Sequence, residues 1–356
     1  MDAAAFRAQF PVLERITYLN AGTDGPVPRV AAEAAARELS AQAADGRVHA
    51  HFERRRALAG DLREAYAELL GCDVADVALT TSTSEGIGSV LGGLGLGPSD
   101  EIVTSDREHP GLLGPLILAR RRGVTVKAVP LRDVADAVSA TTTLVACSHV
   151  NWHTGELAPA ALRDVPVPVV LDGAQGVGAI PLDVRALGCA AYAGSGQKWL
   201  CGADGTGMLY VAPGFAERLQ PSRPGYTAFE DATRGLDSTF SAEARKLDAV
   251  SLPREGVALS LTALELLAGT GFEAIFARAA RLAGELARRL AESGRTVAPR
   301  AETTLVAWED ADPPATRERL AAAGVAIRDL PGTSYLRASV GAWNDAADLD
   351  RLLEAL

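Results

Sequence analysis

The chain has 356 residues, 48% hydrophobic content and a formal net charge of −10. This length and apolar content allow a large core, and we expect two domains. The acidic balance argues against nucleic acid as a partner, and no stretch is apolar enough to span a membrane. The N-terminus lacks the basic start and apolar core of a signal peptide, so a cytoplasmic protein is expected. We predict reduced thiols and no metal site, because the cysteines show no CxxC spacing: Cys72, Cys147, Cys189 and Cys201.

The N-terminal half alternates predicted helices and strands. Residues 1–12 predict a short helix stopped by Pro11, and residues 16–28 predict a strand that runs into a loop rich in Gly and Pro. Residues 30–70 predict two helices broken near Asp45 and Gly46. Further short strands are predicted at residues 101–104, 124–130 and 143–149.

A Thr- and Ser-rich turn within residues 77–96 is a candidate anion site. A short strand leads through this turn into a helix, with Ser82 or Thr83 as the N-cap and Glu85 in the first turn. Free N–H groups and hydroxyls at a helix start suit a phosphate, although an ordinary capped helix has the same pattern.

The central stretch carries an acid and a lysine in unusual surroundings. The apolar run 167–171 is typical of a buried parallel strand, and it ends on Asp172, where a side chain faces the ligand crevice. A second apolar segment, residues 189–193, precedes Lys198 in a glycine-flanked setting. Such a lysine is a candidate Schiff-base nucleophile, and the carboxylate is suited to hold a pyridinium nitrogen protonated. A buried loop with a paired lysine is the alternative.

The C-terminal part predicts a smaller α/β unit. Residues 205–211 predict a strand, and residues 221–243 predict a long loop. Residues 256–293 have the spacing of two helices. Strands and helices then alternate at residues 303–308, 313–323, 325–328, 335–340 and 345–356.

The sequences DGAQ (residues 172–175) and SGQK (residues 195–198) resemble the class V aminotransferase and cysteine desulfurase family of fold type I enzymes, which use pyridoxal phosphate (PLP). The resemblance implies that Lys198 carries the cofactor, that Asp172 lies under the pyridine nitrogen and that Gln175 lies beside the ring oxygen. Ser195 and Gln197 are then also cofactor contacts. Gln197 departs from the family pattern, in which many members have histidine.

Other segments match further family motifs in the same order. TSTSE (residues 81–85) resembles the phosphate segment, which implies that Thr83 and Ser84 bind the cofactor phosphate. His109 matches the histidine that stacks on the cofactor ring and relays protons. Ser251 matches a residue that reaches the phosphate of the neighbouring subunit, so the resemblance implies a homodimer with shared active sites.

Four positions within these motifs concern the substrate. Asn20 and Gly22 lie in an opening loop whose backbone borders the substrate in the family. Trp152 stands where the family has asparagine, and it is expected to line an aromatic pocket wall. The sequence YLRASVGAWND resembles the family signature whose arginine clamps the α-carboxylate, and Arg337 offers that group a planar pair of donors.

The resemblance implies an α/β, fold type I architecture. We expect a large PLP-binding domain, residues 16–255, with a mixed, mostly parallel seven-stranded sheet between helices, and a small domain of residues 1–15 and 256–356. The resemblance also implies that the protein is a homodimeric enzyme that acts on an amino acid.

The choice among possible reactions depends on a cysteine that this chain lacks. The loop of residues 328–335 lacks the cysteine of desulfurases, which favours a carbon–sulfur β-lyase acting on a cysteine-derived substrate without an enzyme persulfide. An aminotransferase and an amino-acid epimerase stay open. So does a catalytically silent binding protein, although Asp172 and Lys198 argue against it.

Overall fold

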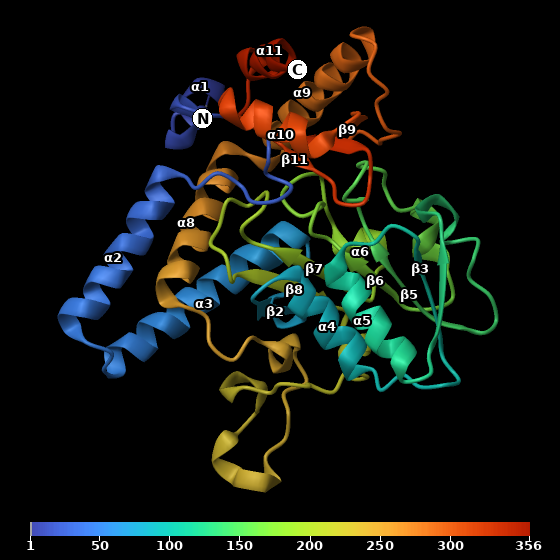
Figure 1. Ribbon diagram of the computed structural model, residues 1–356. Helices are drawn as coiled ribbons and strands as arrows, with labels where there is room; N and C mark the ends of the chain where they lie inside the picture. Colours follow the sequence, from blue (N-terminus) through green and yellow to red (C-terminus); the bar gives the residue numbers. More distant parts are fainter. Residues whose placement is uncertain (1) are drawn as a thin grey trace.

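The computed structural model describes residues 2–356, and its centre is a seven-stranded sheet in the order β2-β8-β7-β6-β5-β3-β4 (Figure 1). Strand β8 runs antiparallel to both of its neighbours, and the other pairs are parallel. The predicted mixed, mostly parallel sheet is therefore confirmed. Its strands are β2 (Val77–Thr80), β3 (Glu101–Ser105), β4 (Thr125–Val129), β5 (Thr142–Ser148), β6 (Val169–Asp172), β7 (Ala191–Ser195) and β8 (Gly207–Val211).

Helices cover both faces of this sheet because its inner strands are apolar on both sides. In β6, Val170 packs in the core under α4 (Thr83–Gly93) and α5 (Pro110–Arg121). Its neighbours Val169 and Leu171 face the opposite core, which includes residues of α3 (His49–Leu70) and α8 (Arg254–Thr270). Successive strand residues point to opposite faces, so a continuous apolar run is what a strand buried on both sides requires.

The remaining strands form two small sheets with a core of their own. Strands β9 (Leu305–Glu309), β12 (Tyr335–Ser339) and β11 (Arg328–Asp329) pair antiparallel in the order β11-β12-β9. Strand β1 (Thr17–Tyr18) pairs in parallel with β10 (Val325–Ala326), so the N-terminal segment joins the C-terminal part. Helices α1 (Ala3–Arg7), α9 (Phe272–Glu292), α10 (Pro313–Ala322) and α11 (Ala346–Ala355) lie around these strands (Figure 1).

The predicted break in the first long helical region is confirmed. Helix α2 (Arg29–Asp45) ends at Gly46, whose φ of 74° suits glycine, and α3 follows. Helix α8 packs against α2 and α3 rather than on the small sheets. The domain boundary near residue 256 therefore stays a proposal.

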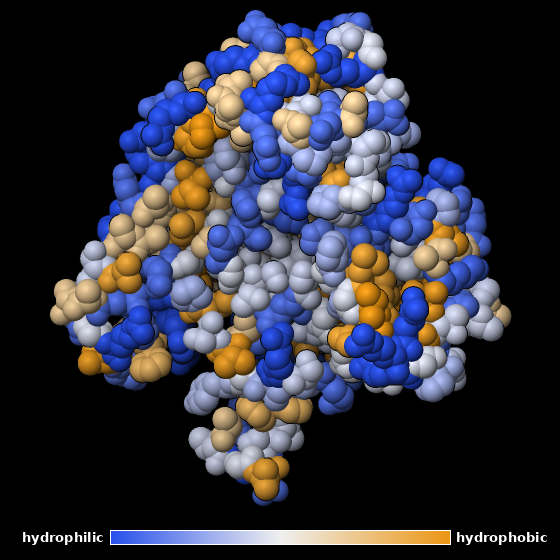
Figure 2. Space-filling model, viewed as in Figure 1, coloured by the Kyte–Doolittle hydropathy of each residue, from blue (hydrophilic) through white to orange (hydrophobic). Residues whose placement is uncertain are grey.

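The long loop predicted at residues 221–243 forms an arm that projects from the body (Figure 1). Phe229 and Phe240 pack on each other with ring centroids 5.2 Å apart, which closes the arm on itself. Tyr226 and Leu236 are left exposed. Figure 2 shows apolar surface at the tip of this arm.

Three helices were not predicted: α5, α6 (Val184–Leu187) and α7 (Pro213–Ala216). In the described residues, no single helix is long and apolar enough to cross a membrane; α8 and α9 would together suffice by length and composition, but they meet at a bend of 83°.

Candidate active site

The site forms where the carboxyl ends of β6 and β7 meet. These strands are parallel neighbours, so Asp172 at the end of β6 lies close to the segment after β7 that carries Lys198. A cavity of about 210 Å³ lies between them. It is lined by Gly22, Thr23, Ser82, Thr83, Ser84, His109, Trp152, Asp172, Ala174, Gln175, Ser195, Gln197, Lys198, Arg328 and Arg337. The fold thus gathers most of the residues singled out from the sequence around one cavity.

Asp172 and Lys198 have pKa values shifted toward each other. Burial lowers the pKa of Lys198 to about 8, although Asp172 opposes this shift. Burial raises the pKa of Asp172, while Lys198 and the backbone N–H of Ala174, 3.0 Å from Oδ1, act in the opposite direction. An amine that gives up its proton near neutral pH is typical of a catalytic base.

The start of helix α4 forms one end of the cavity. Ser82 is the N-cap, and its side chain accepts a hydrogen bond from the N–H of Glu85 at 3.2 Å. Thr83 donates its backbone N–H to the hydroxyl of Ser195 at 3.1 Å, and the two hydroxyls are 2.8 Å apart. The helix N-terminus and these hydroxyls, with Ser84 beside them, suit a phosphate group.

His109 caps α5 and faces Trp152. Its Nδ1 accepts the N–H of Gly111 at 3.1 Å, so Nε2 carries the proton of the neutral ring. The rings of His109 and Trp152 meet edge to face with centroids 5.1 Å apart. Burial, and then the charges of Lys198 and the site arginines, lower the pKa of His109 to about 4. The imidazole is therefore neutral at pH 7.

Gln175 ties the opening loop to the central segment. Its Nε2 donates to the carbonyl oxygen of Gly22 at 2.7 Å, and its Oε1 accepts from the indole of Trp199 at 3.0 Å. A Cβ on Gly22 would lie 2.7 Å from the Ser339 hydroxyl and 2.9 Å from Arg337 Nη2. Only glycine fits here without displacing its neighbours.

Two arginines approach the cavity from the small sheet. Arg337 in β12 is buried, and its Nη1 donates to the carbonyl oxygen of Trp152. Arg328 in β11 is its cross-strand partner, and the only hydrogen bond of the Arg328 guanidinium among residues 2–356 is to the Thr23 hydroxyl at 3.2 Å. Burial, and then Arg328, lower the pKa of Arg337 to about 9, so it stays charged at pH 7.

Arg328 was not among the site residues predicted from the sequence. A signal for it exists in the chain, because an arginine ends the short apolar strand of residues 325–328. Its importance depends on pairing with Arg337, which only the sheet register reveals.

Several buried polar atoms around the cavity have no partner among residues 2–356. They are Nε and Nη2 of Arg337, Oε1 of Gln197, Nε1 of Trp152 and Oγ of Ser339. Buried polar groups are normally hydrogen-bonded, so such a cluster marks a place for a polar, anionic ligand. A cofactor with a phosphate, together with a substrate carboxylate, fits these groups.

Two predicted residues lie away from the cavity. Asn20 accepts a hydrogen bond from Thr23 at 2.9 Å and does not line the cavity. Ser251 is exposed and lines a separate groove of about 280 Å³ beside α4, with Thr81 and Glu85. Its predicted contact with a neighbouring subunit stays a prediction.

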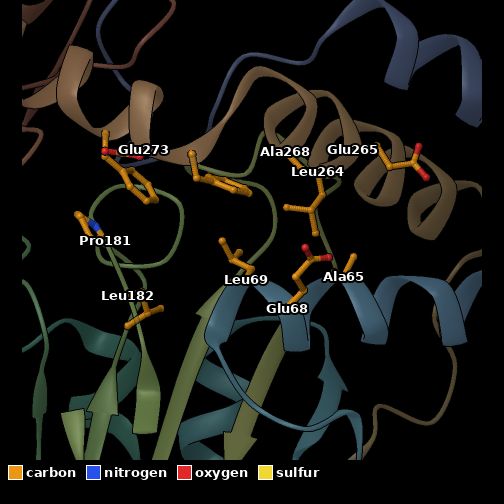
Figure 3. A pocket seen from close by; sticks show the side chains of 11 residues that line it. Ala65, Glu68, Leu69, Pro181, Leu182, Leu264, Glu265, Ala268 and Glu273 are labelled. Atoms are coloured by element: carbon orange, nitrogen blue, oxygen red, sulfur yellow. The ribbon is translucent and has the colours of Figure 1, made fainter. Parts of the chain in front are cut away.

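A further groove of about 530 Å³ lies between α3, α8 and α9 (Figure 3). Leu69, Leu182 and Leu264 line it, and carboxylates of Glu68, Glu265 and Glu273 are also present. It holds none of the cavity residues and no cationic side chain. We therefore place the chemistry at the smaller cavity.

The sequence model of the family Aminotransferase class-V matches residues 17–352. This chain belongs to the class-V aminotransferase family. The class-V chain is 29% identical to isopenicillin N epimerase of Streptomyces clavuligerus over 382 residues. The aligned region covers 96% of this chain and 94% of the epimerase. It is 30% identical to the cysteine desulfurase CsdA of Escherichia coli over 392 residues, and this alignment covers 100% of this chain and 97% of CsdA.

Two solved structures of the lyase C-DES resemble this class-V chain at 28% identity. One is a complex of the cystine C-S lyase C-DES with its product cysteine persulfide, with a TM-score of 0.90 over 98% of this chain and 99% of that one. The other is a C-DES mutant with glycine covalently linked to its PLP cofactor, with a TM-score of 0.91 over 98% of both chains. The class-V protein is thus a PLP-dependent enzyme with the fold type I architecture.

Proposed function

We propose that this enzyme is a carbon–sulfur β-lyase that cleaves a cysteine-derived substrate directly, without an enzyme persulfide. The observation that carries the proposal is the absence of a thiol at the site. None of the free cysteines, Cys72, Cys147, Cys189 and Cys201, lines the cavity. Burial also raises the pKa of each of these thiols, which disfavours the nucleophilic thiolate.

The residues of the cavity divide the work of holding cofactor and substrate. We assign the phosphate to Thr83 and Ser84, and the ring nitrogen to Asp172, which keeps its proton in place. The unpartnered Nε and Nη2 of Arg337 are assigned to the substrate α-carboxylate. PLP, when bound, supplies an electron sink for the pair left at Cα.

Lys198 is the proposed base. Its amine removes the Cα proton, and the Cβ–S bond breaks with both electrons leaving on sulfur. The sulfur takes a proton and departs as a thiol. Water then completes the balance: one conjugate and one water give one thiol, one pyruvate and one ammonium ion.

The reaction is tested by supplying a cysteine S-conjugate with no added keto acid and measuring pyruvate. Many turnovers of pyruvate per site support the lyase. One turnover that stops with the cofactor in its pyridoxamine form would instead identify an aminotransferase. Exchange of solvent deuterium into Cα without pyruvate would identify an epimerase, and either result overturns the proposal.

The assignment of Lys198 is tested separately from the reaction. Borohydride reduction of the holoenzyme should fix PLP on the peptide that contains Lys198. Lys198→Ala should abolish this link, whereas Lys127→Ala, on edge strand β4, should retain it. Recovery of the label on another peptide would contradict the assignment.

We also propose that the active form is a homodimer in which Ser251 reaches the partner's cofactor phosphate. The exposed side chains of Ser251 and Val250, and the projecting arm with Tyr226 and Leu236 exposed, support this proposal. Mixing Lys198→Ala chains with Ser251→Ala chains should give a heterodimer with one site intact. A monomer that binds PLP tightly contradicts it.

A further inference from the structure

A second, larger cavity adjoins the cofactor cavity. We call it the vestibule, and it has a volume of about 660 Å³. His109, Trp152 and Arg328 line both cavities, so the two are continuous around these side chains. Cavities of roughly 300 to 1,000 Å³ are typical of small-molecule sites. The vestibule is therefore large enough for a substantial group beyond the substrate's Cβ.

A short hairpin between β11 and β12 borders the vestibule. Residues 330–334 connect β11 to β12, and the N–H of Leu330 donates to the carbonyl oxygen of Tyr335 at 3.0 Å. Gly332, with a φ of 77°, makes the tight turn. The hairpin therefore forms one wall of the vestibule. Pro331, Gly332 and Ser334 are exposed at its rim.

Planar side chains line the vestibule next to the cofactor cavity. The rings of Trp152 and His153 lie 4.0 Å apart between centroids and are tilted by 35°, and Tyr335 lines the same space. Burial lowers the pKa of His153 to about 4, so this ring is neutral at pH 7. Such a wall favours an aromatic or other planar apolar group.

The free charges of the vestibule favour an anion. Arg107 is exposed at its edge and has no hydrogen bond or ion pair among residues 2–356. Arg328 lies at the junction of the two cavities. The carboxylates present are Glu108, which is buried against Ser105 and Ser148, and the exposed Asp106. Two arginines thus face the vestibule, and one of its two acids is already engaged.

We propose that the vestibule is a subsite for the sulfur substituent of the substrate, and that it selects a bulky planar substituent bearing an anionic group. This inference rests on the proposed lyase function. The substrate's α-carboxylate binds Arg337, its Cβ–S bond points past His109, and its substituent lies along Trp152 toward Arg107. The thiol that leaves then carries this large acidic group.

Binding is measured by calorimetry on the PLP-loaded Lys198→Ala protein, so that no turnover occurs. The probes are S-methyl-, S-benzyl- and S-(4-carboxybenzyl)-L-cysteine. We expect the benzyl conjugate to bind about tenfold more tightly than the methyl one, because its ring is buried. The carboxylate should add about fivefold. Adding Arg107→Gln to this protein should remove the fivefold gain from the carboxylate and leave the preference for benzyl over methyl unchanged. Arg121→Gln, at the exposed end of α5, is the control and should leave both preferences unchanged.

Equal affinities for the three conjugates would overturn the subsite. A carboxylate preference unchanged by Arg107→Gln would overturn the assignment of Arg107. Pyruvate formation by the unmodified enzyme is measured in parallel, which separates the two proposals. If no conjugate yields pyruvate but the affinity order holds, the lyase proposal and the departing thiol fail, whereas binding of the substituent in the vestibule is still supported.

Discussion

Replacement of Arg337 tests the carboxylate assignment directly. In the structure, its Nη1 is committed to the carbonyl oxygen of Trp152, which leaves Nε and Nη2 as two buried donors. A hydrogen bond to a charged group contributes about 1.5 to 3 kcal/mol, so two of them contribute at least about 3 kcal/mol. Arg337→Gln should therefore lower kcat/KM by a hundredfold or more.

The assay compares a cysteine conjugate with its α-carboxamide in both proteins. The unmodified enzyme should strongly prefer the carboxylate, and Arg337→Gln should reduce that preference to near unity, because the two changes remove the same interaction. Retained PLP absorbance and an unchanged melting temperature show that the variant is folded. A loss of less than tenfold, or a preserved preference for the carboxylate, would refute the reasoning.

Three further results are expected. Gly22→Ala should lower kcat/KM by roughly tenfold, because the added Cβ would lie 2.7 Å from the Ser339 hydroxyl; Gly60→Ala, where nothing lies within 4 Å, is the matched kinetic control and should change little. Exchange of solvent deuterium into Cα should rise with pH through about 8, the pKa of the Lys198 amine, and level off above it; a flat profile between pH 6 and 9 would exclude Lys198 as the base. Burial raises the pKa of Glu108 from 4.5 to about 7, so its contribution to stability is present below pH 4.5 and is lost as the pH rises through 7. The glutamine of the Glu108→Gln variant cannot ionise, so the free energy of unfolding of this variant minus that of the unmodified protein should rise by about 2 kcal/mol between pH 5.5 and 8.5. Urea denaturation measures both free energies. If their difference is the same at the two pH values, Glu108 does not ionise in this range.

The segment that carries Asp172 and Lys198 could be singled out from the sequence because its signal is local. Asp172 ends an apolar run, and Lys198 follows a second one within a glycine-flanked stretch, so residue type and position already indicate the chemistry. The seven-stranded sheet followed from the family resemblance, and the structure confirms it. The assigned roles of the individual site residues stay predictions until the variants above are measured.

The parts that were missed depend on contacts between distant segments. Helix α5 contains Pro110, Gly111, Gly114 and Pro115, which disfavour a helix by local propensity. It forms nevertheless, because Pro110 occupies the first turn, where no N–H is needed, and buried side chains such as Leu112 and Leu116 hold it on the sheet. The vestibule likewise combines loops after β3, β5 and β11, whose proximity no short motif reports.

Lys198 follows strand β7 of the large sheet, whereas Arg337, the proposed carboxylate ligand, stands on the small sheet. This separation has a consequence for engineering the enzyme. The alignment of Lys198 with Arg337 depends on how the small sheet is seated on the large one, through links such as Gln175 to Gly22 and Arg337 to Trp152. A substitution in the packing between the sheets can therefore misplace the substrate by a fraction of an ångström while the fold stays intact. Activity would then decline without any loss of thermal stability, and screens that select on melting temperature alone would retain such variants.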